Sequence, residues 1–153
     1  MQSPVRVLPF GFMALMLGCA PAEQGEAGDR GAAVEAAVSE TAVMAAVIAS
    51  PASGDTVDAA FTLMLETRNV ELRPAGTMEP GTGHHHLFID RAIVPVDTVI
   101  PAAPGIVHLG AAQREYTYDD LAPGPHVIIA VLGDHEHRRI AGALTDTIQF
   151  IVR

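Results

Sequence analysis

The chain has 153 residues, 18 acids against 9 bases and a formal net charge of −9. This balance argues against binding to nucleic acid or charge-driven docking on anionic lipid, because both need clustered basic residues. The length fits one domain, and the single cysteine, Cys19, excludes an intramolecular disulfide.

The N-terminus has the features of an export signal. Residues 1–6 carry one arginine and no acid, and an apolar run over residues 7–18 is too short to cross a bilayer, which needs about 20 apolar residues. The run ends in LMLGC, which resembles the lipobox of bacterial lipoproteins, where cleavage precedes a cysteine that then carries the lipids. We expect residues 1–18 to be a lipoprotein signal peptide and Cys19 to be lipidated. A plain signal peptide with an incidental Cys19 is the alternative.

Residues 19–40 are rich in alanine, glycine and glutamate, and this composition is typical of a flexible linker. The lipobox resemblance implies that the protein is exported and lipid-anchored to a membrane of the cell envelope. Residues 20 and 21 are Ala and Pro, and the absence of Asp after the cysteine favours the outer membrane, facing the periplasm, by resemblance to enterobacterial lipoproteins.

The remaining residues, 41–153, show the alternation of apolar and polar side chains that predicts β-strands. We expect strands near residues 41–49, 61–66, 84–90, 114–119, 126–132 and 145–152, separated by loops that contain proline and glycine. An alanine-rich helix over part of residues 32–49 is the local alternative. About seven short strands predict an all-β, immunoglobulin-like β-sandwich, although the cysteine and tryptophan core of that fold is absent.

Seven histidines lie in this domain, and two of them share a strand face. Alternate side chains of a strand point the same way about 6.5–7 Å apart, so His84 and His86 should lie together with Phe88 and Asp90. Neutral imidazoles in this arrangement suit copper or zinc. A third ligand must come from another segment.

The nearly continuous apolar run over residues 126–132 predicts a central strand, and the segment that follows it supplies further candidate ligands. Asp134, His135 and His137 lie close together there, and His108 is the other candidate. The sequence therefore predicts a metal site drawn from His84, His86, His108, Asp134, His135 and His137.

Other readings of these histidines stay open. Histidines on strands often hydrogen-bond to carbonyl or carboxylate groups and bind nothing. We expect His126 to be a turn or strand-edge residue, and His85 to be a hydrogen-bonded residue on the core side. The sequence has no nucleophile elbow, zinc-protease motif or phosphate-binding glycine loop, so it names no catalytic residue.

Four segments in order resemble the domain-of-unknown-function 4399 family: residues 83–90 (GHHHLFID), 108–110 (HLG), 121–126 (LAPGPH) and 132–137 (LGDHEH). The resemblance covers about residues 42–153 and implies an exported bacterial domain. Two features depart from the family pattern. Ile140 stands where the family usually has a further histidine, and Arg138-Arg139 replaces a stretch that contains proline. In addition, His135 is not a position that the pattern supplies.

These observations predict an envelope lipoprotein whose histidine-rich sandwich binds a ligand, with copper or zinc as the expected metal. One alternative is a structural or protein-interaction module without metal. The other is a metal-dependent enzyme of unknown substrate.

Overall fold

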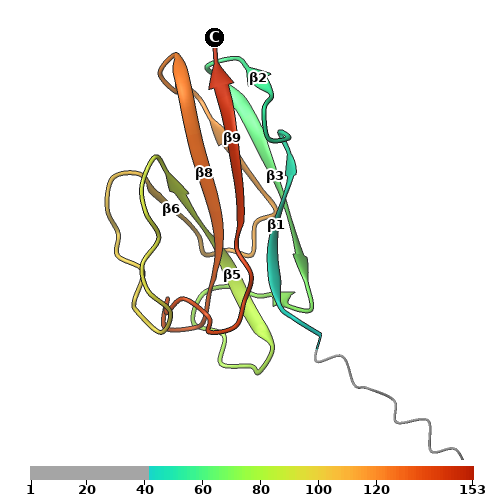
Figure 1. Cartoon of the computed structure of the whole chain (residues 1–153). Helices are drawn as coiled ribbons and strands as arrows, with labels where there is room; N and C mark the ends of the chain where they lie inside the picture. The colour runs from blue at the N-terminus through green and yellow to red at the C-terminus, as the bar shows by residue number, and fades with distance from the viewer. Residues whose placement is uncertain (1–41) are drawn as a thin grey trace, which may run out of the picture. The chain divides into compact units, whose positions relative to one another are not determined.

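A computed structural model describes residues 42–153, and this part of the chain consists of strands and loops without a helix (Figure 1). The strands, in order, are β1 (Ala45–Ser50), β2 (Thr56–Val57), β3 (Phe61–Arg68), β4 (Glu71–Leu72), β5 (Thr82–Ile89), β6 (Ile106–Leu109), β7 (Glu115–Tyr118), β8 (Gly124–Gly133) and β9 (Asp146–Val152). Seven of these are longer than two residues. The expected all-β class is confirmed.

The strands form two sheets that pack as a sandwich. The smaller sheet has the order β1-β3-β7, and the larger has β2-β9-β8-β5-β4, with β6 paired to β5 beside β4. Figure 1 shows β8 and β9 in one layer and β1 and β3 in the other. The sandwich is confirmed, whereas its immunoglobulin-like subclass stays a prediction.

The boundaries of the first strand differ from the expectation. β1 begins at Ala45, and residues 42–44 precede it without strand structure. Ala45 pairs with Arg68, the last residue of β3, so residues earlier than Ala45 have no partner strand in that sheet. The start of β1 is therefore set by its backbone pairing with β3, and this pairing cannot be inferred from the alternation of apolar and polar residues.

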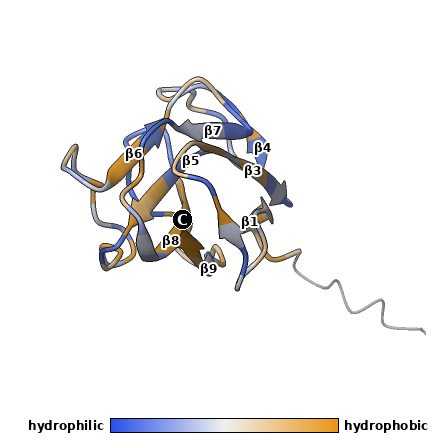
Figure 2. Ribbon diagram, turned by 90° about the horizontal axis from the view of Figure 1, so that it is seen from above, coloured by the Kyte–Doolittle hydropathy of each residue, from blue (hydrophilic) through white to orange (hydrophobic). Residues whose placement is uncertain are grey.

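The main core lies between the two sheets. On β3, Leu63 and Leu65 are buried while Thr62 and Met64 are exposed, as the alternation predicted. β8 lies between β9 and β5 in the larger sheet, which confirms it as a central strand. Its colouring in Figure 2 is mainly hydrophobic, as expected for a strand with neighbours on both sides.

A second, smaller core covers the outer face of the larger sheet. Phe88 on β5 and Val131 on β8 pack there against Ile100 from the long connection between β5 and β6. Because this connection covers the outer face, β5 is buried on both sides, and its residues Gly83–Phe88 are all buried. The histidines of β5 therefore sit among packed side chains.

The predicted signal peptide, linker and lipidated Cys19 lie outside the described residues. Within residues 42–153, we find no helix with the length and apolar character needed to span a membrane.

Candidate metal centre

The larger sheet brings three histidines to one place. His84 and His86 share the outer face of β5, as their spacing predicted, and each is about 1–2% exposed. β6 pairs with β5 so that His108 lies directly opposite His86. Opposite residues of an antiparallel pair have their Cβ atoms about 5 Å apart, so this register places the His108 ring beside the pair.

A tight turn after β8 supplies the fourth histidine. Oδ1 of Asp134 accepts hydrogen bonds from the backbone N–H groups of Glu136 and Arg138, at 2.9 and 2.8 Å. The N–H of His137 donates to the Asp134 carbonyl at 2.9 Å, and His137 takes a left-handed conformation with φ of 63°. Such a conformation is uncommon outside glycine and carries strain, and it is often found at functional sites.

The four rings meet in one cluster, which we call the histidine cluster: His84, His86, His108 and His137. All six distances between their ring centroids lie between 4.7 and 5.9 Å. Nε2 of His86 lies 3.0 Å from Nε2 of His84, so one of these nitrogens donates a hydrogen bond to the other.

Three of these histidines fit a single ion most closely. His84, His108 and His137 each offer a ring nitrogen, and these nitrogens lie within 4.8 Å of one another. In a tetrahedral zinc site with metal–nitrogen distances of about 2.1 Å, the nitrogens lie about 3.4 Å apart. The nitrogens here are up to 4.8 Å apart, so a bound ion would draw them closer together. His108 is exposed and His137 is half-buried, whereas His84 is buried.

Two glycines make room for the rings. A Cβ on Gly110 would overlap Cε1 of His108, and a Cβ on Gly133 would lie 2.8 Å from Nε2 of His86. Neither glycine is among the residues with positive φ, so the available space rather than the backbone conformation requires glycine. Neither glycine is recognisable as part of the site from the sequence, because a glycine at the end of a strand is typical of an ordinary turn.

The cluster is electrostatically unusual for histidine. Burial, followed by the proximity of His108 and His137, lowers the pKa of His84 to about 4. Burial and the neighbouring imidazoles lower the pKa of His86 to about 3, and burial also lowers the pKa of His108. The rings of His84 and His86 are therefore neutral at pH 7, which is the form that ligates metal.

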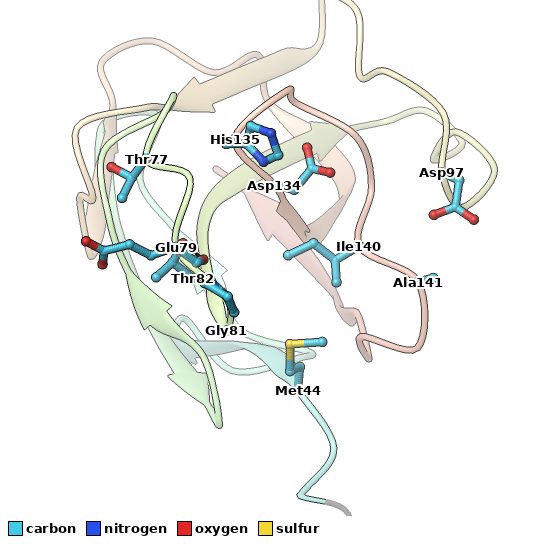
Figure 3. A pocket seen from close by; sticks show the side chains of 11 residues that line it. Met44, Thr77, Glu79, Gly81, Thr82, Asp97, Asp134, His135, Ile140 and Ala141 are labelled. Atoms are coloured by element: carbon cyan, nitrogen blue, oxygen red, sulfur yellow. Dashed lines mark hydrogen bonds between the residues drawn. The ribbon is translucent and has the colours of Figure 1, made fainter.

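His135 and Asp134, which the sequence placed among the candidate ligands, lie differently. His135 lines a separate cavity of about 370 Å³ together with Asp134, Glu79 and Met44 (Figure 3). It is absent from the group of converging nitrogens found among the described residues. Asp134 holds the turn through its backbone contacts, and its charge acts to raise the pKa of His84.

His135 and His137 are two residues apart, as His84 and His86 are, but they do not share a face. β8 ends at Gly133, and the turn that follows sends the two side chains to different places. Strand periodicity does not apply to residues in a turn.

Asp90 and His126 lie away from the cluster and contact each other. Asp90 was expected on the face of His84, but it follows β5 with φ of 53°, which turns it off that face. Nδ1 of His126 lies 2.6 Å from Oδ2 of Asp90, and Nε2 lies 2.7 Å from the carbonyl of Ala122. Both ring nitrogens of His126 are thus occupied by protein acceptors.

His85 faces the core, as expected, and is fully buried. The expected hydrogen bonds are wrong, because neither ring nitrogen has a protein partner within the described residues. Burial, with a smaller contribution from the charge of Arg114, lowers the pKa of His85 to about 4. The residue therefore behaves as a neutral part of the core.

The fold and site define a β-sandwich domain with a four-histidine cluster at one end of its larger sheet. A family model described as "Domain of unknown function (DUF4399)" matches residues 63–153, and the chain belongs to that family. No curated protein and no solved structure is found to be similar to the chain.

Proposed function

We propose that this domain binds a copper or zinc ion through the histidine cluster, in a protein that is lipid-anchored in the cell envelope. The observation that supports it best is the convergence of three ring nitrogens within 4.8 Å, from β5, β6 and the turn after β8. Neutral imidazoles are the preferred nitrogen ligands of both metals. His84, His108 and His137 are the proposed ligands, and His86 is either a fourth ligand or the hydrogen-bond partner of His84.

The contacts of the cluster also support metal binding over a purely structural role. Nε2 of His86 and Nε2 of His84 reach only each other, and neither ring has a carbonyl or carboxylate hydrogen-bond partner within the described residues. The structural histidine His126, by contrast, places both ring nitrogens on protein acceptors. Ring nitrogens that meet other ring nitrogens are an arrangement that a metal ion satisfies.

Titration of the metal-free full chain with Cu²⁺ and Zn²⁺ tests the proposal. We expect binding at micromolar or tighter concentrations, and at least a hundredfold loss of affinity in the double variant His84→Ala, His86→Ala. His135→Ala is the matched control, and it should bind as the parent does because His135 lines the other cavity. Equal binding by the double variant and the parent would contradict the proposal.

The envelope part of the proposal depends on Cys19. We expect the chain to fractionate with membranes and Cys19→Ser to move to the soluble fraction, because the thiol is needed to accept the lipid. Immunoblotting of both fractions measures this. A parent that is itself soluble after signal cleavage would leave the domain exported but without an anchor.

A further inference from the structure

The histidine cluster opens onto a cavity. This cavity has a volume of about 380 Å³, and His86, His108 and His137 form part of its lining. The rest of the lining comes from residues 99–103 and Ile106, which carry no charged or hydrogen-bonding side chain. A bound ion would therefore have nitrogen ligands on one side and an apolar hollow beside it.

The charge of the site indicates what would occupy this hollow. Imidazole ligands are neutral, so a divalent ion in the cluster would keep both of its positive charges. No acidic residue lines the cavity. The carboxylate of Asp134, whose Oδ1 accepts two backbone N–H groups and whose charge acts on His84 from the neighbouring turn, offsets at most one of these two charges. An incompletely compensated charge beside buried side chains is unfavourable, so an anion from solution would be bound favourably.

The number of ligands leads to the same conclusion. Metal sites with three protein ligands leave a fourth position for water or an external ligand. His84, His108 and His137 would supply the three, with His86 as the hydrogen-bond partner of His84 and not a ligand, and two of the three line the cavity. An external ligand at this position would extend into space bordered by Ile100 and Ile106.

We propose that the metal-loaded cluster binds a small organic carboxylate, whose oxygen takes the open position on the metal and whose apolar body fills the cavity. This inference rests on the proposed metal binding and adds the class of ligand. Apolar lining with one polar anchoring group is typical of small-molecule sites.

Cobalt provides the test, since its visible absorption changes when its ligands change. The full chain is loaded with Co²⁺ and titrated with benzoate, with acetate as the same donor without the ring, and with benzyl alcohol as the ring without the carboxylate. We expect a saturable spectral change with benzoate, at least tenfold weaker binding of acetate, and no change with benzyl alcohol. Equal binding of benzoate and acetate would overturn the role of the cavity.

Variants that fill the cavity test its location. Ala102→Phe and, separately, Ala103→Phe add a ring to the apolar lining and should weaken benzoate binding at least tenfold with cobalt affinity unchanged. Ala92→Phe is the control, because Ala92 is an exposed residue of the same connection outside the lining. Unchanged benzoate binding by a folded cavity variant would overturn the proposal. Failure of cobalt to bind without benzoate would instead overturn the proposed function, and this inference with it.

Discussion

The two ends of the β5–β8 ladder use histidine in opposite ways. The ladder runs from the pair of His84 with Gly133 to the pair of Ile89 with Ile128. At the first end, the imidazoles of the cluster contact one another, and the pKa values of His84 and His86 are lowered. Just beyond the second end, His126 contacts a carboxylate and a carbonyl.

The histidine pKa values differ between the two ends more because of hydrogen-bond partners than because of burial. The His126 side chain is only 11% exposed, yet its pKa is raised. Burial acts to lower that pKa, but hydrogen bonds to the Ala122 carbonyl and the Asp90 carboxylate outweigh it. Hydrogen bonds to these two acceptors are enough to explain why a histidine occupies position 126. The four histidines of the cluster mainly contact one another, so no such structural role explains them.

The largest expected effect is a loss of metal affinity at the histidine cluster without a matching loss of folding stability. We expect His137→Gly to lower metal affinity about a hundredfold, because it removes one proposed ligand. The free energy of unfolding should stay within about 0.5 kcal/mol of the parent, since glycine relieves the left-handed backbone at this position while increasing the entropy of the unfolded chain. Calorimetric titration and urea unfolding measure the two quantities. A large loss of stability in the metal-free variant would make His137 a structural residue.

The second effect tests the space around the rings. Gly133→Ala should lower the free energy of unfolding by about 1–3 kcal/mol, because its Cβ would overlap the buried ring of His86. Adding His86→Ala to this variant removes the ring that it meets, so the two changes should cost less together than the sum of each alone. Urea unfolding of the metal-free single and double variants gives the coupling. If the destabilisation of the double variant equals the sum of the two single variants, the Cβ added at Gly133 does not clash with the His86 ring.

The smallest effect concerns the other end and its pH dependence. We expect Asp90→Asn to destabilise the domain by about 1 kcal/mol at acidic pH, because it removes the charged acceptor of His126. The pKa of His126 is raised in the folded state, so this stabilisation is complete below about pH 6.5 and is lost as pH rises through the folded value. Urea unfolding at about pH 5.5 and about pH 9 should show the difference between parent and variant shrinking.

Metal affinity should be unchanged in Asp90→Asn. An altered metal affinity would mean that the two ends are coupled through the sheet and do not act independently.

The sequence by itself determined six of the seven longer strands and part of the site, but it did not predict β6, nor the two-residue strands β2 and β4. Alternation on β3 and β9 identified the buried residues Leu63, Leu65, Ile148 and Phe150, because the two-residue period of a strand is a local property. The same period placed His84 and His86 on one face, and it assigned His85 to the core.

Only the tertiary structure decided which other groups meet these histidines. The pairing of β6 with β5 brings His108 opposite His86, and the turn after β8 selects His137 over His135. Register and turn geometry depend on contacts between distant segments, so a local residue pattern does not encode them. The close approach of Gly133 to a ring 47 positions earlier in the chain, that of His86, has the same origin.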